Sequence, residues 1–254
     1  MSLLVKYGEP WIILPESRYD ITDRKIDAYM DDDFSLFMKV KVFRDKMPMG
    51  EEGFVFARSG KHSGISFNRF RDGNGDEHIN LMFTYWFKEN GFCQIIYKPT
   101  EEELNDFIEI VVINDDLNKK VFSLYVNGNL IEEKEYFEEK QSYRFGEMGG
   151  GGFYQFGNGN FQVPDIAMYC ECEFDIIFLF KKIMSYDELK SFSETYKEHM
   201  EVFLEELKVF KPTVPYRNDL AFFLDFENQN RYKVWELTHN GNYLSKATLE
   251  NLYF

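Results

Sequence analysis

Three acidic residues at alternate positions could perform acid–base chemistry. They are Glu171, Glu173 and Asp175, and they lie in a stretch with the pattern of a β-strand. Side chains two residues apart on a strand point to the same side of a sheet, so the three carboxylates are expected on one face. Retaining glycoside hydrolysis needs two carboxyl groups about 5–5.5 Å apart, which such neighbours reach only by leaning together. The triplet makes glycoside hydrolysis one hypothesis for this chain.

A second set of residues could bind a ligand without catalysis. Tyr85, Trp86 and Tyr154 offer rings on which a sugar could pack, and Asn158 and Asn160 offer amides for its hydroxyl groups. Tyr154 is the strongest candidate for an exposed ring because it adjoins a glycine-rich loop. The alternative is that these aromatic residues belong to the core, since alternation buries half of the side chains on a strand.

Calcium ligands could come from two segments. Residues 72–76 (Asp-Gly-Asn-Gly-Asp) begin like a calcium loop, but Glu77 replaces glycine at position six and Phe83 replaces glutamate at position twelve. A hairpin turn is the better interpretation of this segment. Residues 31–33 (Asp-Asp-Asp) could ligate calcium at the rim of a sandwich, although an acidic solvated loop explains them better. No cofactor other than calcium is expected, and none of the four histidines has metal or triad spacing.

The composition restricts the kinds of partner that this chain can bind. A formal net charge of −15 repels phosphate backbones and anionic lipid headgroups, so we expect neither nucleic-acid binding nor membrane insertion. The sequence shows no signal peptide and no apolar run of about 20 residues. Cys93, Cys170 and Cys172 form an odd set without disulfide spacing, which predicts three reduced thiols. Reduced thiols favour the cytoplasm, but the compartment itself stays open.

The periodicity of the sequence predicts an all-β protein with one long helix. Short alternating segments follow each other without intervening helices, which is typical of a two-sheet antiparallel β-sandwich, or jelly roll. Ser185 and Glu188 form a capping box for an amphipathic helix predicted over residues 185–211. A closing strand is expected over residues 220–226.

We expect a single domain over residues 1–248. The end of the chain, residues 249–254, resembles a remnant of a protease-cleavage tag and is left out of the fold prediction.

Three segments carry a family pattern. Phe34–Val42 is similar to an "F-x-hydrophobic-x-hydrophobic-x-V" strand, Leu124–Gly128 to an "L-Y-V-N-G" hairpin, and Asp175–Leu189 to a closing strand with a capped helix. Together they resemble the laminin-G-like branch of the concanavalin A-like lectin–glucanase superfamily. The resemblance implies a concanavalin A-like jelly roll that recognises carbohydrate or protein, sometimes with calcium. The superfamily's β-glucanases show acids in the order Glu-x-Asp-x-(x)-Glu, from which this chain's Glu-x-Glu-x-Asp departs.

These features favour binding over catalysis. The first hypothesis is a noncatalytic binding module of a larger protein, with carbohydrate as its ligand. The second is a β-glucanase-like glycoside hydrolase that uses Glu171, Glu173 and Asp175. The third is a structural or protein-interaction domain. The expected partner is accordingly a glycan or a protein.

Overall fold

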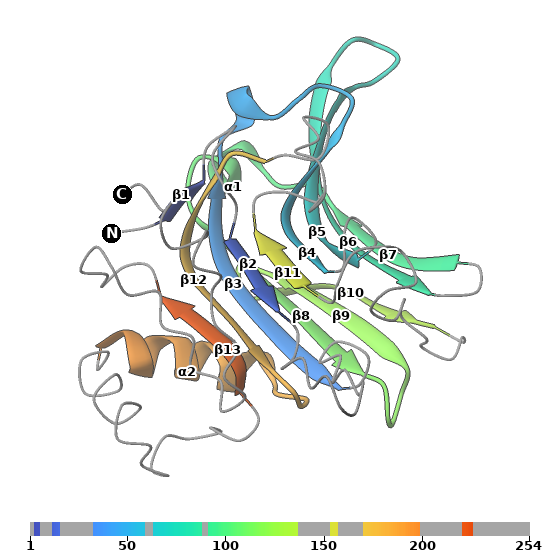
Figure 1. The fold of residues 1–254 in the computed structure, drawn as a ribbon. Helices are drawn as coiled ribbons and strands as arrows, with labels where there is room; N and C mark the ends of the chain where they lie inside the picture. Colours follow the sequence, from blue (N-terminus) through green and yellow to red (C-terminus); the bar gives the residue numbers. More distant parts are fainter. Residues whose placement is uncertain are drawn as a thin grey trace.

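Strands dominate the computed structural model and form two sheets (Figure 1). The structure describes residues 3–5, 12–15, 33–58, 63–87, 91–136, 153–156, 170–198 and 220–225. The strands are β1 (Leu3–Val5), β2 (Ile12–Pro15), β3 (Phe34–Val42), β4 (Glu52–Arg58), β5 (Ser63–Arg71), β6 (Glu77–Phe87), β7 (Gly91–Tyr97), β8 (Ile108–Asp115), β9 (Val121–Val126), β10 (Asn129–Glu135), β11 (Phe153–Phe156), β12 (Cys172–Phe180) and β13 (Leu220–Asp225). The helices are the 3-10 turn η1 (Arg44–Lys46), α1 (Glu101–Leu104) and α2 (Tyr186–Glu198).

Among the described strands, one sheet runs β1-β12-β3-β8-β9-β10, with β13 also paired to β12, and the other runs β2-β11-β4-β5-β6-β7. Every pairing between these strands is antiparallel. The predicted two-sheet antiparallel β-sandwich is therefore confirmed. We refer to these as the first sheet and the second sheet.

The strand predicted over 220–226 is present as β13. It pairs with Ile176–Phe180 of β12, while β1 pairs with Cys172–Phe174 of the same strand. Because β3 occupies the other side of β12, β1 and β13 lie along one side of it (Figure 1).

The main core lies between the sheets and follows from the alternation of each strand. Phe34 and Leu36 of β3 are fully buried in it, as the pattern of that strand predicts. Phe122 of β9 packs against Phe83 and Tyr85 of β6, with ring centroids 5.1 Å apart in both pairs. Since β9 and β6 belong to different sheets, Phe122 joins the two layers.

Helix α2 covers part of the outer face of the first sheet with a second apolar cluster. Phe37 of β3 stacks on Phe178 of β12 at 4.8 Å, and Phe192 of α2 packs edge-on against Phe178 at 4.9 Å. Both faces of β3 and β12 are therefore covered, which explains why the sequence of β12 is a nearly continuous apolar run.

The predicted capping box starts helix α2. The backbone N–H of Ser185 donates to the Glu188 carboxylate at 2.8 Å, and the backbone N–H of Glu188 donates to Ser185 Oγ at 3.3 Å. The described part of the helix is Tyr186–Glu198, so the remainder of the span predicted to residue 211 lies outside the described residues.

The Asn-Gly hairpin and the start of α2 contact one another. Asn127 and Gly128 form the turn between β9 and β10 with φ angles of 47° and 84°. Tyr186 lies over this turn, and a Cβ atom on Gly128 would lie 3.2 Å from its hydroxyl. The same hydroxyl donates a hydrogen bond to buried Glu109, which also accepts one from Lys190 at 2.6 Å. The two segments thus meet on the outer face of the first sheet.

All three cysteines are free and buried, which confirms the expectation of reduced thiols. Burial raises the pKa of the Cys93 thiol to about 11, so this thiol is poorly reactive at neutral pH.

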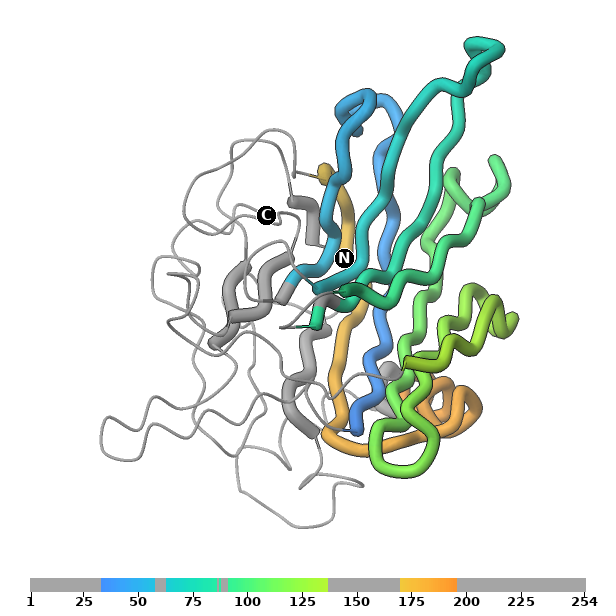
Figure 2. The backbone as a smooth tube through the Cα atoms, turned by 90° about the vertical axis from the view of Figure 1, so that its right-hand side faces the viewer, coloured from blue at the N-terminus to red at the C-terminus, as the bar shows by residue number. Residues whose placement is uncertain are grey.

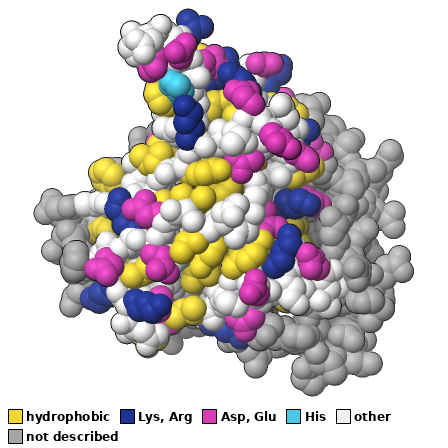
Figure 3. Space-filling model, turned by 180° about the vertical axis from the view of Figure 1, so that it is seen from behind, with side chains coloured by type: hydrophobic (Ala, Val, Ile, Leu, Met, Phe, Trp, Pro, Cys, Tyr) yellow, Lys and Arg dark blue, Asp and Glu magenta, His cyan; other side chains and the backbone are white. Residues whose placement is uncertain are grey.

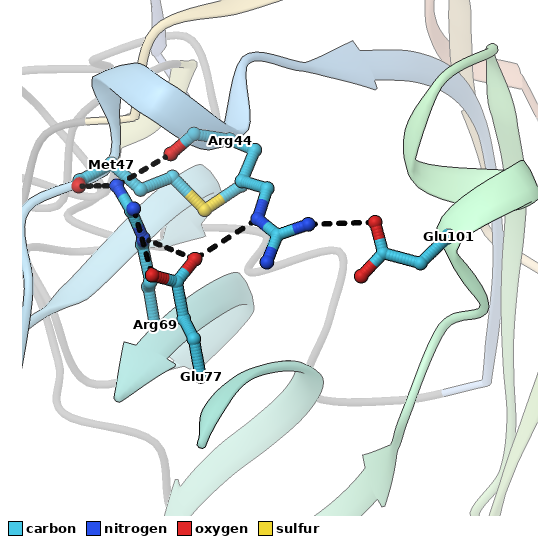
Figure 4. Close-up of polar contacts among 5 residues, drawn as sticks. All are labelled: Arg44, Met47, Arg69, Glu77 and Glu101. Atoms are coloured by element: carbon cyan, nitrogen blue, oxygen red, sulfur yellow. Dashed lines mark hydrogen bonds and ion pairs between the residues drawn. The ribbon is translucent and has the colours of Figure 1, made fainter. Parts of the chain in front are cut away.

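An ion-pair network lies near the turn of the β5–β6 hairpin, which projects beyond the other strands (Figures 1 and 2). Arg69 donates to both carboxylate oxygens of Glu77, at 2.9 and 3.0 Å. Arg44 donates to Glu77 at 2.9 Å and to Glu101 at 2.6 Å (Figure 4). Arg69 also donates to the backbone carbonyl of Met47 at 3.4 Å. The network therefore joins the hairpin to the turn after β3 and to α1.

Replacing Glu77 with glutamine is expected to lower the free energy of unfolding at pH 7, because two guanidinium groups lose their shared carboxylate. Hydrogen bonds from Arg69 and then Arg44 lower the pKa of Glu77 from 4.5 to about 2. A depressed folded-state pKa stabilises the protein above pH 4.5, and this contribution is lost as the pH falls toward about 2.

Urea denaturation of the native protein and Glu77→Gln, at steps from pH 7 to about pH 2, measures the effect. The difference between the two proteins should shrink across that window. Glu102→Gln, on the exposed side of α1, is the matched control and should change little. A difference that stays constant across the window would contradict the assignment.

Candidate ligand-binding face

The three acids of the hydrolase hypothesis lie at β12 on the outer side of the first sheet. Asp175 is buried and forms an ion pair with Lys39 at 3.3 Å, and β12 has a register shift at this point. Glu173 is partly exposed and lies opposite Lys41 in register, and Glu171 just precedes the strand. Because the buried Asp175 carboxylate is paired with Lys39, it has the character of a structural ion pair. This arrangement gives no support to a role as a free catalytic acid.

The prediction that the Tyr85 ring is offered to a ligand is wrong. Its side chain is fully buried and packs against Phe87 and Phe122, because it lies on the inward phase of β6. Trp86 follows it on β6 and Tyr154 lies on β11, but their side chains fall outside the described part. Asn158 and Asn160 lie outside the described residues altogether.

The outward phase of β5, β6 and β7 gathers a different set of side chains. Residues in register across a sheet share a face, and the residues alternating with this set are buried in the main core. We call this set the amide face. Its members are Asn68, Asn80, Met82, Thr84, Phe92, Gln94 and Ile96, of which Met82 and Thr84 are buried, with exposed fractions of 8% and 5%.

Two amides of this face have no partner among the residues that the structure describes. Asn68 and Asn80 lie directly opposite each other on β5 and β6, and both are partly exposed. Within the described ranges, neither side chain makes a hydrogen bond. Gln94 of β7 donates to Thr84 Oγ1 at 3.0 Å. Each primary amide can donate two hydrogen bonds and accept others, so Asn68 and Asn80 have unused capacity for a ligand.

Apolar side chains flank these amides. Phe92 and Ile96 stand on either side of Gln94 on β7, with exposed fractions of 53% and 49%. Trp86, predicted to bind ligand, is the register partner of Phe92 on β6. Seen from behind, the molecule shows hydrophobic side chains gathered across the middle of its surface, with charged side chains of both signs around them (Figure 3).

A charged cluster closes the hairpin end of the amide face. The Lys98 ammonium lies 2.9 Å from Nδ1 of His78, and Nε2 of His78 lies 3.1 Å from a carboxylate oxygen of Asp72. Because an ammonium can only donate, Nδ1 accepts and Nε2 carries the proton that is donated to Asp72. The hydrogen bond from His78, with others from the backbone of the turn, lowers the pKa of Asp72.

The segment 72–76 is a hairpin turn, as expected. Asp72 Oδ1 accepts from the backbone N–H of Asn74 at 2.9 Å and of Asp76 at 3.0 Å, so this carboxylate oxygen stabilises the turn. Of the three consecutive aspartates, Asp33 accepts from the backbone N–H of Asp116 at 2.9 Å, and the other two lie outside the described residues. The described ranges contain no group of three or more His, Cys, Asp or Glu side chains that could hold a metal ion.

The sequence contains a pattern that indicates the amide face, and the prediction of ligand-binding residues did not use it. From His78 to Tyr85 polar residues mostly occupy the even positions and apolar residues the odd ones, which marks one face of a strand as polar. That alternation assigns Asn80 and Thr84 to the face of the sheet that points away from the main core, and Tyr85 to the core, although Thr84 is itself buried. The partners Asn68 and Gln94 could not be assigned without the register of β5 and β7.

No family model and no curated protein matches the chain. Its fold is similar to solved botulinum neurotoxin binding domains. For serotype D/C VPI 5993, the match covers 61% of this chain and 34% of that one, with 14% identity and a TM-score of 0.41. For the neurotoxin DC domain in complex with rat synaptotagmin II, it covers 74% and 40%, with 13% identity and a TM-score of 0.47. For that domain in complex with SialylT, it covers 74% and 40%, with 14% identity and a TM-score of 0.46.

This chain therefore spans 34–40% of the length of those neurotoxin chains. Among the described residues, no helix has the length and apolar character needed to cross a membrane.

Proposed function

We propose that this chain is a noncatalytic binding module of the concanavalin A-like, laminin-G-like type, and that the amide face binds carbohydrate. The observation that carries the proposal is the pair Asn68 and Asn80, whose amides have no partner in the described part of the chain and lie on the same sheet face as the exposed ring of Phe92. A strand-borne site of this kind is held rigidly by the sheet beneath it, which lowers the entropic cost of binding.

The chemistry of the amide face suits a sugar. Hydroxyl groups of a sugar both donate and accept, and a primary amide such as that of Asn80 does the same within one planar group. The apolar C–H side of a sugar ring can pack on an exposed ring such as that of Phe92. A few polar groups on a largely apolar surface are typical of small-ligand sites.

Removing either kind of contact is expected to weaken glycan binding. Asn80→Ala deletes an amide that has no role in the described protein contacts, and Phe92→Ala deletes the exposed ring. We expect each to raise the dissociation constant about tenfold, which corresponds to about 1.4 kcal/mol. A glycan array identifies the ligand, and isothermal titration with that glycan measures the loss.

Matched controls lie in the turn between β8 and β9 and at the C-terminal end of α1. Leu117→Ala removes a hydrophobic side chain that is 77% exposed, and Asn105→Ala removes an exposed amide. Both should bind like the native protein. An array without any bound glycan, or unchanged binding by Asn80→Ala and Phe92→Ala, would refute the proposal.

A protein ligand is the second candidate, and one observation favours it. Strand β7 is an edge strand among the described ones, and it carries no charged residue from Gly91 to Tyr97. Charged residues within a strand normally protect such edges, as Glu132–Glu135 do on β10. The Gln94 carbonyl of β7 already accepts from Lys134 of β10 at 2.8 Å, so a partner strand would pair with the rest of this edge. The glycan array separates the two candidates.

A further inference from the structure

The Lys98 ammonium is a hydrogen-bond donor with unused capacity. Its residue is exposed, and its one hydrogen bond in the described protein goes to Nδ1 of His78. No described acidic residue lies within ion-pair distance of it, although the chain has a formal net charge of −15. An ammonium has three donor hydrogens, so two remain for a ligand.

The acid that is bound to His78, Asp72, cannot easily neutralise this group. One oxygen of Asp72 accepts two backbone N–H groups of its turn, and the other accepts from His78. The imidazole ring of His78 therefore stands between the Asp72 carboxylate and the Lys98 ammonium. The His78 ring positions the lysine and leaves the other side of the ammonium exposed to solvent.

Among the described strands, the other acid on this sheet face is remote from Lys98. Glu52 of β4 is in register with Asn68 of β5, and its carboxylate accepts from Ser66 Oγ at 2.5 Å. Three strand spacings separate β4 from β7, which is about 14 Å. This separation exceeds the Debye length of about 10 Å at 0.1 M salt, so Glu52 affects an anion beside Lys98 only weakly.

The amides of the proposed sugar site are close to Lys98. Asn80 follows His78 by two residues on the same face of β6, a rise of about 7 Å, and Asn68 is its register partner. An ammonium and two amides at this spacing can contact the carboxylate and the hydroxyl groups of a single sugar residue.

We infer that the amide face selects acidic glycans, and that Lys98 holds the carboxylate of the bound sugar. The inference rests on the proposed carbohydrate-binding function and adds the class of ligand. An ion pair at an exposed site should favour an acidic sugar over its neutral counterpart about fivefold at low salt.

A matched pair of sugars tests this directly. Methyl β-D-glucuronide and methyl β-D-glucoside differ only in the carboxylate at C6, and NMR titration in about 50 mM salt gives both dissociation constants. We expect tighter binding of the glucuronide, a preference that declines as salt is added. Lys98→Gln should bind both sugars equally, and Lys98→Arg should keep the preference.

Lys119→Gln, an exposed lysine in the turn between β8 and β9, makes the same charge change elsewhere and should leave the preference intact. Equal binding of the two sugars by the native protein would overturn the inference and leave the proposed function standing. A preference that survives in Lys98→Gln would overturn it as well. If neither sugar binds and the array is also empty, the proposed function fails together with it.

Discussion

Replacing Gly64 with alanine is expected to destabilise the sandwich by about 3 kcal/mol or more. A Cβ atom at this position would lie 2.1 Å from the carbonyl oxygen of Phe56 and 2.9 Å from the Cα atom of Ala57. Both are backbone atoms of β4, so no side chain can rotate away. The pairing of β4 with β5 shifts register between Phe54 and Phe56, and the two backbones approach each other closely just beyond that shift.

Relief of this contact would require β4 and β5 to separate. Gly64 is also the register partner of Thr84, so the same displacement would disturb the amide face. Chemical denaturation of the native protein and Gly64→Ala measures the loss. Gly73→Ala is the control, because a Cβ atom there meets nothing within 4 Å, and we expect a change of less than about 0.5 kcal/mol. Equal stability of the two variants would show that β4 and β5 are not packed as described.

Replacing Phe122 with alanine is expected to cost about 3–5 kcal/mol, the usual range for deleting a fully buried phenylalanine ring. Its ring packs against Phe34 at 6.2 Å, Phe83 at 5.1 Å and Tyr136 at 4.8 Å. These neighbours come from both sheets, so the cavity would open between the layers, where neither sheet can collapse without moving the other. Thermal and urea unfolding should both report the loss.

Phe92→Ala gives the matched comparison. It deletes the same ring from a position that is 53% exposed, and we expect the free energy of unfolding to fall by less than about 1 kcal/mol. The two substitutions should therefore separate stability from binding, because only Phe92 belongs to the amide face. Comparable destabilisation by both would place Phe92 in the core and remove it from the proposed site.

Local patterns in the sequence were sufficient to predict the fold class. The alternation of Phe34–Val42 places one side chain in two in the main core. Ser185 and Glu188 specify the start of α2 through hydrogen bonds within a single turn. The Asn127–Gly128 turn needs positive φ angles, which these two residue types tolerate best. Each of these features depends on residues within a few positions of one another.

The binding face required contacts that no local pattern contains. An aromatic residue has the same sequence signal in a core as on a surface, so Tyr85 and Phe92 could not be told apart by type. A register shift in β12 accompanies the pairing of Asp175 with Lys39, a residue more than 130 positions away. The register of β5, β6 and β7 brings Asn68 opposite Asn80, and the packing of the hairpin places Lys98 against His78.

The sequence by itself therefore determined the strands, the capped helix, the tight turns and the free thiols, because their causes are local or compositional. Only the tertiary structure decided which polar groups have partners and which do not. Asn68, Asn80 and Lys98 became candidates for a ligand because strand pairing brings them to one sheet face without satisfying them within the described protein. Pairing is a relation between segments distant along the chain, and the spacing of residues within each segment does not encode it.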